Sequence, residues 1–440
     1  MTIRKRRLAH AALAGASALL LAGCLSSGGS SGGGNAKDST VEIMYGFSNQ
    51  QSDDFKASMK DFLSKEGINV KFSPTPDFDK LIRSRVAGNN LPDIAIFPQP
   101  GITLDIARSG KLADLTTLSG YADATKDDVP GIIDAATSNG KVYAAPMSIS
   151  VKSLVWYPKK PFEDAGYKIP KTQAELLALT NQIKSDGHTP WCVGIEAAAA
   201  TGWAATDWVE DYVLRFGGPE TYDKWVKHQI PFNDPVVKKA LDEIAKIWFP
   251  SGNVLGGRKS INSNAVLTAG NPMFDNPPKC YLHRQASFLA QPGSFPDAVV
   301  NNLDQRAGVF ELPPIKAGDP DSIMGGGDLA GLFNQKNKDA QKVVEYMIGP
   351  DYKGYPKAST GGSGGYISPH KTYDLSLQPN QTMRDISKIA YSADNFRFDG
   401  SDSMPGEVGA GSFWREMVAW VGGKSTNDTL DAIEQSWPSS

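Results

Sequence analysis

The sequence predicts an α/β protein built from two lobes, each with a mostly parallel sheet flanked by helices. Two observations lead to this class. About 400 residues follow an N-terminal apolar segment, which is more than one hydrophobic core usually contains. From residue 41 onward, strand-like and helix-like patterns alternate, as they do in parallel sheets covered by helices.

The first lobe begins with a β-α-β-α-β pattern. Apolar, β-branched stretches read as strands, and the segments between them carry apolar side chains at helical spacing. The expected strands are 41–47, 68–74 and 91–98, and the expected helices are 48–67 and 77–90. Ligands of such sheets bind at the carboxyl ends of the strands. Residues 46–50 and 97–101, which include Gln99, therefore form a candidate binding site.

Residues 1–23 read as a signal peptide. Four basic residues precede an apolar run that is too short to span a membrane, which takes ~20 apolar residues. Residues 21–24 (LAGC) resemble a bacterial lipobox, so we expect cleavage before Cys24 and lipidation of its thiol. The Gly/Ser-rich residues 24–39 would be a flexible tether on the extracytoplasmic face of the cell membrane. The alternative is an ordinary secretory signal with a chance cysteine.

Net charge bears on the class of binding partner, and the cysteine count bears on disulfide formation. Loss of the signal peptide removes four basic residues and changes the formal net charge from −3 to −7, which argues against a nucleic-acid partner. With Cys24 lipidated, Cys192 and Cys280 remain, an even number in an oxidising compartment. We expect these two to form a disulfide; the alternative is a pair of buried free thiols.

Residues 140–184 carry a specific resemblance. They contain a turn followed by YAAP, an extended run, WY, FEDAG and PKTQAEL. This order resembles the extracellular solute-binding proteins that bind carbohydrates, the relatives of maltose-binding protein. The resemblance implies a type II periplasmic-binding-protein fold in which this extended run is the hinge and the sugar binds between the lobes. Residues 191–215 and 280–288 are most similar to the branch that binds α-glucosides.

The resemblance covers nearly all of residues 40–440 and implies how they divide. Residues 307–350 look like the return of the chain to the first lobe, and residues 404–437 look like a closing pair of helices. The implied N-terminal lobe comprises 40–150 and 312–356, and the implied C-terminal lobe comprises 151–311 and 357–440.

Two tryptophans lie at the predicted start of a helix in residues 197–218. Thr206 is a plausible N-cap, and Gly217 and Gly218 would end the helix. Trp208 starts an i, i+4 aromatic stripe, which favours the core. Trp203 precedes the cap, in a segment where the family places a ligand contact, so we expect its ring to stack on the sugar. Asp207 is the expected hydroxyl acceptor beside it.

Residues 396–414 read as a polar, glycine-rich loop before a helix. Asp399 and Asp402 are candidate sugar acceptors, with loop formation or helix capping as the alternative. Trp414 opens a stripe with i, i+3, i+4 and i+7 spacing that would suit a core. The motif GSFW, however, matches the position where family members place a sugar-stacking aromatic, and we favour stacking.

Three further candidates complete the expected site. Asp328 follows three glycines, which are either only a turn or a place where the backbone approaches a ligand closely. Its carboxylate can accept two sugar hydroxyls. Arg284 and Phe295 lie in a strand-then-loop segment of the α-glucoside-like region, beside His283, which reads as a structural histidine.

Other motifs limit the chemistry. The chain has five histidines without H-x-x-x-H or H-x-H spacing and has no calcium-loop pattern, so we expect no metal or cofactor. No phosphate-binding loop occurs, so the ATPase of an ABC importer would be a separate chain beside the membrane permease. The sequence therefore predicts a monomeric, non-enzymatic protein that captures an α-glucoside or related oligosaccharide. The alternatives are a secreted carbohydrate hydrolase and a binding protein for a non-sugar solute.

Overall fold

The computed structural model of the chain describes residues 40–47, 49–291, 293–354 and 366–438. These residues belong to one compact unit, Ser39–Ser440. The expected signal peptide, the lipidated Cys24 and the tether lie outside the described residues. In the part of the chain that is described, no helix combines the length and apolar character needed to cross a bilayer.

A six-stranded mixed sheet forms the first lobe. Its strands are β1 (Val41–Tyr45), β2 (Val70–Pro74), β3 (Ile94–Phe97), β6 (Ala145–Val151), β10 (Ser322–Leu332) and β11 (Asn395–Phe398). β1 pairs in parallel with β2 and β3, as the sequence predicts, whereas β10 runs antiparallel to β3 and β6 and parallel to β11. A two-stranded sheet of β4 (Thr137–Ser138) and β5 (Lys141–Val142) lies apart from it.

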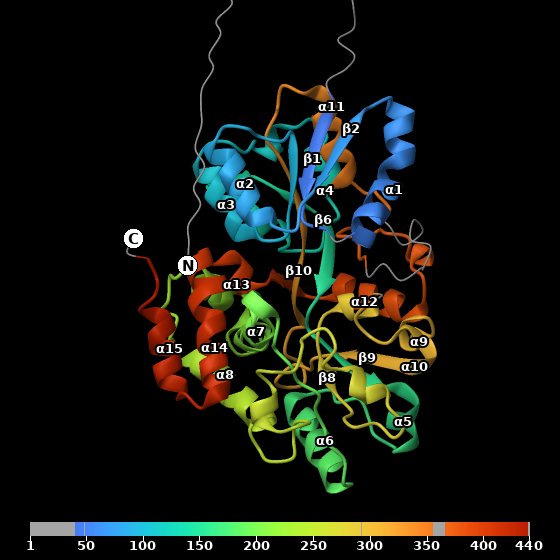
Figure 1. The fold of residues 1–440 in the computed structure, drawn as a ribbon, viewed down its shortest axis with the longest axis vertical. Helices are drawn as coiled ribbons and strands as arrows, with labels where there is room; N and C mark the ends of the chain where they lie inside the picture. The colour runs from blue at the N-terminus through green and yellow to red at the C-terminus, as the bar shows by residue number, and fades with distance from the viewer. Residues whose placement is uncertain (1–39, 48, 292, 355–365, 439–440) are drawn as a thin grey trace, which may run out of the picture. The chain divides into compact units, whose positions relative to one another are not determined.

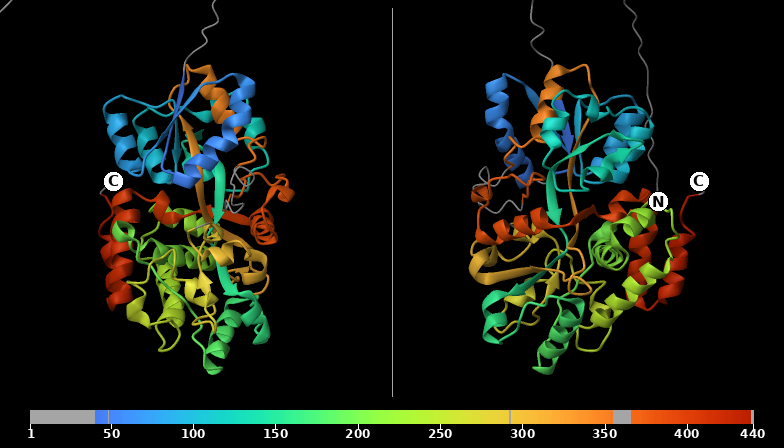
Figure 2. Two further views of the ribbon diagram at one scale, coloured as in Figure 1. Left: turned by 45° about the vertical axis from the view of Figure 1, so that its right-hand side comes forward. Right: turned by 180° about the vertical axis from the view of Figure 1, so that it is seen from behind.

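Helices cover both faces of the first-lobe sheet, because successive side chains of β1 point in opposite directions. Ile43 and Tyr45 pack with Phe55 of α1, while Met44 packs with Phe78 of α2. Figures 1 and 2 show α1 and α11 on one face and α2 and α3 on the other. These helices are α1 (Asn49–Glu66), α2 (Phe78–Ala87), α3 (Pro100–Arg108), α4 (Tyr121–Thr125) and α11 (Lys338–Met347).

The second lobe has a three-stranded sheet in the order β8 (His283–Arg284), β7 (Leu154–Pro158), β9 (Ala307–Glu311). The two-lobe α/β class is confirmed, but this sheet is antiparallel rather than mostly parallel, because β7 runs outward along the crossover while β8 and β9 run back. Its main helices are α5 (Lys159–Asp164), α6 (Gln173–Ser185), α7 (Trp203–Val226), α8 (Pro235–Trp248), α14 (Trp414–Gly422) and α15 (Thr426–Glu434). Shorter or connecting helices are α9 (Asp297–Val300), α10 (Leu303–Arg306), α12 (Gln381–Ser392) and α13 (Gly400–Ser403).

Large aromatic side chains and a disulfide hold the second lobe together. Trp208 is 3% exposed, and its ring centroid lies 5.5 Å from that of Trp191 and 5.4 Å from that of Trp248. The prediction that Trp208 belongs to the core is therefore confirmed. The predicted disulfide is also present, because Cys192 and Cys280 are bonded, with their Cα atoms 5.6 Å apart.

The strand pair β6 and β10 connects the two lobes (Figure 1). Leu329–Leu332 of β10 pairs with β3, whereas Ser322–Gly325 pairs with β11. Besides β6 and β10, the segment after residue 366 also contacts the first lobe through isolated bridges. Ile367 pairs with Ile149 of β6, and His370 pairs with Asp128. The expected hinge segment thus runs through a paired strand, and the residue boundaries of the lobes stay predictions.

Candidate functional site

The site begins at the N-terminus of α7, which starts four residues earlier than the sequence predicts. Gly202 adopts a left-handed backbone with φ 116°, and a Cβ added there would collide with the backbone carbonyl of Trp414. The helix therefore starts at Trp203, and Thr206 donates a hydrogen bond back to the Trp203 carbonyl (2.8 Å) instead of capping it. At the other end, Gly218 has φ 73° and breaks the helix as predicted. This start places the half-buried ring of Trp203 in the first turn.

Lys152 stands at the centre of a buried charged cluster. It lies between β6 and β7, and its Nζ is 3.1 Å from Oδ1 of Asp207 and also pairs with Oδ2 of Asp399. Its Nζ lies 5.4 Å from the ring centroid of Trp203. The residue is only 8% exposed, and both carboxylates are buried. The crossover, α7 and the end of β11 therefore meet at one ammonium group.

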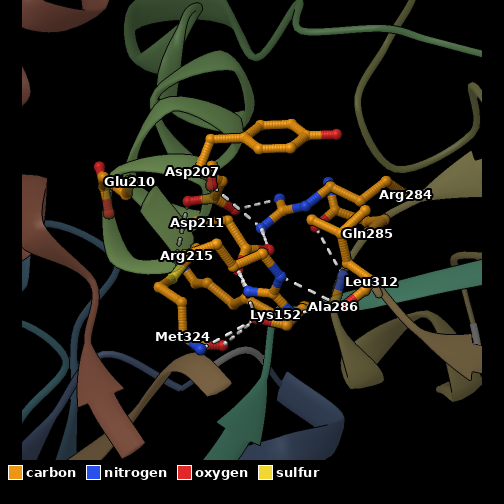
Figure 3. A network of polar contacts seen from close by, with 12 residues as sticks. Lys152, Asp207, Glu210, Asp211, Arg215, Arg284, Gln285, Ala286, Leu312 and Met324 are labelled. Carbon is orange, nitrogen blue, oxygen red and sulfur yellow. Dashed lines mark hydrogen bonds and ion pairs between the residues drawn. The ribbon is translucent and has the colours of Figure 1, made fainter. Parts of the chain in front are cut away.

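A second group of ion pairs continues from Asp207 along α7 (Figure 3). Arg284 lies 3.6 Å from Asp207 and 2.8 Å from Asp211, which also pairs with Arg215. Arg284 is 3% exposed, so its guanidinium is occupied by carboxylates of the protein. Asp207 and Asp399 are buried to the same degree, so burial does not set Arg284 apart from them, and the expected contact of Arg284 with the ligand stays a prediction.

Glu210 lies one turn after Asp207 on α7, and its carboxylate comes within 4.8 Å of oxygens of Asp207 and Asp399. Its carboxylate accepts hydrogen bonds from the backbone N–H groups of Gly400 (2.7 Å) and Ser401 (3.2 Å). Burial raises the pKa of Glu210 well above its usual range. Glu210 thereby fastens the turn after β11 to α7.

The segment that reads as a loop in the sequence is largely helical. β11 leads directly into α13, and a π-helical turn (Val408–Phe413) leads into α14. Glycine and serine lack the apolar periodicity that would have indicated these turns. Asp399 caps α13 by accepting from the backbone N–H of Asp402 (2.9 Å), so it is both a cap and an ion-pair partner of Lys152.

Gln99 and Asp402 join α3 to α13. The Nε2 of Gln99 donates to Oδ1 of Asp402 at 2.7 Å. Residue 101 must be glycine for this approach, because a Cβ there would lie 2.8 Å from the carbonyl oxygen of Met404. The sequence analysis predicted that Gln99 lies at the carboxyl end of a strand, and in the structure α13 packs beside this position.

Titration behaviour differs among the three aspartates of the cluster. Burial raises the pKa of Asp207 to about 7, against the pull of Lys152. Burial, together with the negative charge of Asp399, raises the pKa of Asp402 to about 8. Burial opposes ionisation of Asp399 too, but Lys152 and hydrogen-bond donors hold its pKa below its usual range. Asp399 is therefore the member that keeps its charge at neutral pH.

The crossover strands present one polar face. Ser148, Ser150 and Lys152 alternate along β6 with apolar residues that belong to the cores. Ser148 donates to Oδ2 of Asp328 at 2.7 Å, and burial raises the pKa of Asp328 to about 6. The alternation in PMSISVK was the signal for these residues, which the sequence analysis read only as a strand.

The triple glycine before Asp328 is part of β10 and forms no turn. A Cβ at Gly325 or Gly327 would collide with the carbonyl oxygens of β6. At Gly326 the nearest atoms are flexible side-chain atoms, the Ser150 Oγ at 3.4 Å and the Lys152 Cε at 3.5 Å. Close pairing of β10 with β6 therefore explains Gly325 and Gly327, whereas Gly326 faces the side chains of Ser150 and Lys152 on the polar face.

The two remaining expected aromatics differ in placement. Trp414 begins α14 and is half-buried beside Gly202, and its buried Nε1 has no hydrogen-bond partner among the residues that the structure describes. Phe295 is 2% exposed and packs edge-on against Trp156 and Phe274 in a core, so the structure gives it no place in the site. The sequence analysis placed Phe295 in a loop, and a loop position does not show whether a side chain is buried.

A pocket of about 220 Å³ lies next to α13. It is lined by residues of α3 and the 131–137 segment on one side and by α7 and β11 on the other. Within it, Arg397 makes a two-pronged ion pair with Asp223 at 2.7 and 3.0 Å. This pocket marks where elements of the two lobes leave space between them.

Two sets of side chains have the spacing of metal ligands within the described residues. Asp207, Glu210 and Asp399 form one set, in which Lys152 already supplies a cation. The other set is Asp127, Asp128 and His370. Although burial lowers the pKa of His370, the two carboxylates raise it overall, so its ring forms an ion pair. We assign no metal to either set.

Comparison with known proteins gives this geometry a family. Residues 48–354 match the bacterial extracellular solute-binding proteins. The chain belongs to this family. The family is one of binding proteins, which agrees with the resemblance found in residues 140–184.

Two relatives in the family cover most of the chain. The alpha-glucosides-binding periplasmic protein of Rhizobium meliloti is 38% identical over 92% of this chain and 89% of its own length. The osmoprotective compounds-binding protein of a Synechocystis species is 38% identical over 88% of this chain and 90% of its own length.

Similar solved structures confirm the type II fold. The maltose-bound protein MalE3 of T. maritima superposes with a TM-score of 0.65 at 18% identity, covering 90% of this chain and 98% of that one. A probable secreted solute-binding lipoprotein from Streptomyces coelicolor gives a TM-score of 0.70 at 15% identity, covering 92% of this chain and 100% of that one.

Proposed function

We propose that this solute-binding protein captures an α-glucoside or a related oligosaccharide and delivers it to an ABC importer whose ATPase is a separate chain. The observation that carries the proposal is the half-buried indole of Trp203 beside the acceptor carboxylates Asp207 and Asp399. Sugars have apolar C–H faces that stack on rings and hydroxyl edges that donate to carboxylates. The relative from Rhizobium meliloti, named for binding alpha-glucosides, supports this ligand class.

The proposed site draws on both lobes. Trp203, Asp207, Asp399, Asp402 and Trp414 would contact the sugar from the second lobe, Gln99 from α3, and Asp328 from the crossover. A ligand that bridges the lobes stabilises the closed form through contacts that the open form lacks. The closed form would then dock on the permease.

A second candidate ligand is an osmoprotective solute, because the relative from Synechocystis is 38% identical, as is the relative from Rhizobium meliloti. A hydrolase has no such support. Its two carboxyl groups would stand ~5–9.5 Å apart across a scissile bond. Here Asp207 and Asp399 share one ammonium group, and Glu210 is held by backbone N–H groups. We therefore propose that the ligand leaves unchanged.

We further propose that Cys24 carries a lipid and holds a monomer on the extracytoplasmic face of the membrane, after removal of residues 1–23. The basic segment, the short apolar run and the LAGC motif support this. Intact mass of the protein from its own host tests the proposal. An unmodified thiol, or a different mature N-terminus, would contradict it.

Isothermal titration calorimetry with glucose, maltose, trehalose, sucrose, longer maltodextrins and glycine betaine tests the ligand class. We expect one α-glucoside to bind far more tightly than glycine betaine. Binding of glycine betaine alone would favour the second candidate. Chromatography of the same mixtures after long incubation should show no new products, and product formation would favour the hydrolase.

A further inference from the structure

We infer that Lys152 is the positioning residue of the sugar site: from the crossover between the lobes, it fixes the acceptor carboxylates Asp207 and Asp399 in place. The inference rests on the proposed function. It concerns a residue that the sequence analysis did not single out and that stands outside the expected contact set.

The backbone of Lys152 is fixed to both crossover strands. Lys152 follows β6 directly, and its N–H donates to the carbonyl of Met324 in β10 at 2.9 Å. The next residue, Ser153, accepts from the Met324 N–H at 2.9 Å and donates to Asp211 of α7 at 2.8 Å. The base of the lysine side chain is therefore held by the element that joins the lobes.

The side chain reaches the two elements that carry the acceptors. Its ammonium pairs with Asp207 in the first turns of α7 and with Asp399 at the cap of α13, beside the ring of Trp203. Gly326 leaves room for the aliphatic stem, because even a Cβ there would lie 3.5 Å from the Lys152 Cε. Lys152 thus sets the distance between two carboxylates that come from segments far apart in the sequence.

Charge balance makes this lysine hard to replace. Arg284 and Arg215 are engaged by Asp207, Asp211 and Glu311, whereas the ion pair of Asp399 comes from Lys152. Removing one partner of a buried ion pair leaves the other charge uncompensated. Without Lys152, Asp399 would take up a proton and lose acceptor capacity, so a sugar hydroxyl would lose its partner.

A double-mutant cycle tests this role. The variants are K152M, D399N and K152M/D399N, titrated by calorimetry with maltose, trehalose and sucrose, with thermal midpoints measured in parallel. If Lys152 acts through its two carboxylates, K152M weakens binding at least tenfold, and adding K152M to D399N causes a much smaller further loss, because only the pairing with Asp207 is then left to remove. The matched control is K160M, which removes an exposed lysine that pairs with Asp164 on α5 and should change neither quantity.

The outcomes separate the alternatives. If K152M does not fold, the comparison of K152M/D399N with D399N still decides, since residue 399 no longer carries a charge and Asp207 keeps Arg284 at 3.6 Å. Affinity of folded K152M equal to wild type would assign Lys152 a purely structural role and overturn the inference. Additive losses would overturn it as well, in favour of an independent ligand contact. Failure of the wild-type protein to bind any of the three sugars would instead overturn the proposed function.

Discussion

Trp203 and Trp208 stand five residues apart on α7 and face different surroundings. Trp203 is half-buried beside the Lys152 ammonium, whereas Trp208 is enclosed by other tryptophans. We expect W203A to weaken sugar binding at least tenfold, since stacking adds about 1 kcal/mol or more beyond area burial if ring–ring values transfer. Its unliganded melting point should change little. W208A is the contrasting variant, with an expected loss of about 3–5 kcal/mol of stability.

Calorimetric titration and thermal unfolding of the two variants decide between these roles. Intact sugar affinity in W203A would remove Trp203 from the site. A loss of stability in W203A as large as that in W208A would assign it to the core.

The raised pKa of Asp402 predicts a pH-dependent stability. Its folded pKa is about 8, against an ordinary value of 3.8, because of burial and the charge of Asp399. The folded state therefore holds this proton more tightly than the unfolded state, and stability falls as pH rises from about 4 to about 8. D402N removes the titration, so it should raise the melting point relative to wild type at pH 8.5 by a few degrees and much less at pH 5.

Thermal unfolding at the two pH values measures this difference. D385N, which changes an exposed carboxylate on α12, is the control and should show no pH-dependent gain. Equal shifts of D402N at both pH values would mean that Asp402 titrates like an ordinary surface carboxylate.

At the level of single residues, the sequence analysis selected several side chains that the structure brings together, among them Trp203, Asp207 and Asp399 around Lys152. Residue type and helix position were enough to select them. Lys152 was missed because its partners come from α7 and α13, and only the folded chain shows that pairing. Phe295 was misplaced because a loop residue can be buried by elements that its own segment does not predict.

Among the elements, β10 depends on its glycines for close pairing with β6. G327A would push a Cβ into the Ser148 carbonyl, so we expect a loss of about 1–3 kcal/mol or more, as for overpacked cores. G326A, one residue away, meets only flexible side-chain atoms and should remain folded. Urea unfolding compares the two variants. Equal stability of G326A and G327A would show that the strands can separate without cost.

Element prediction succeeded where hydrophobic periodicity was strong. β1, β2 and β3 and the helices between them follow from alternating apolar patterns, and the break of α7 follows from Gly218. The start of α7 was wrong because the left-handed Gly202 is imposed by contact with Trp414, a residue of another helix. α13 was missed because its first residues are held by hydrogen bonds to the side chains of Asp399 and Glu210, which apolar periodicity does not reveal.

At the scale of the whole molecule, the disulfide closes a loop with a sequence separation of 88 residues that contains α7 and α8. The loop-entropy relation gives about 4.5 kcal/mol for a loop of this length. We expect the double variant C192S/C280S to melt several degrees below wild type while still binding its sugar. Calorimetric unfolding with and without reductant measures this. Reductant should lower the unfolding midpoint of the wild-type protein but not that of C192S/C280S. A wild-type midpoint that reductant leaves unchanged would mean that the disulfide adds no stability.

The pairing of Val151 with Gly325 means that the chain leaves and re-enters the first-lobe sheet at one place. The two ends of residues 152–324 are therefore neighbours, an arrangement in which a segment can be exchanged with little damage to the rest of the fold. Recombination at these two junctions would transfer Lys152, Trp203 and Asp207 together as one segment. Asp399 and Asp402 would stay behind. An exchanged segment would then give a new ligand preference only if its α7 packs against the α13 of the protein that receives it.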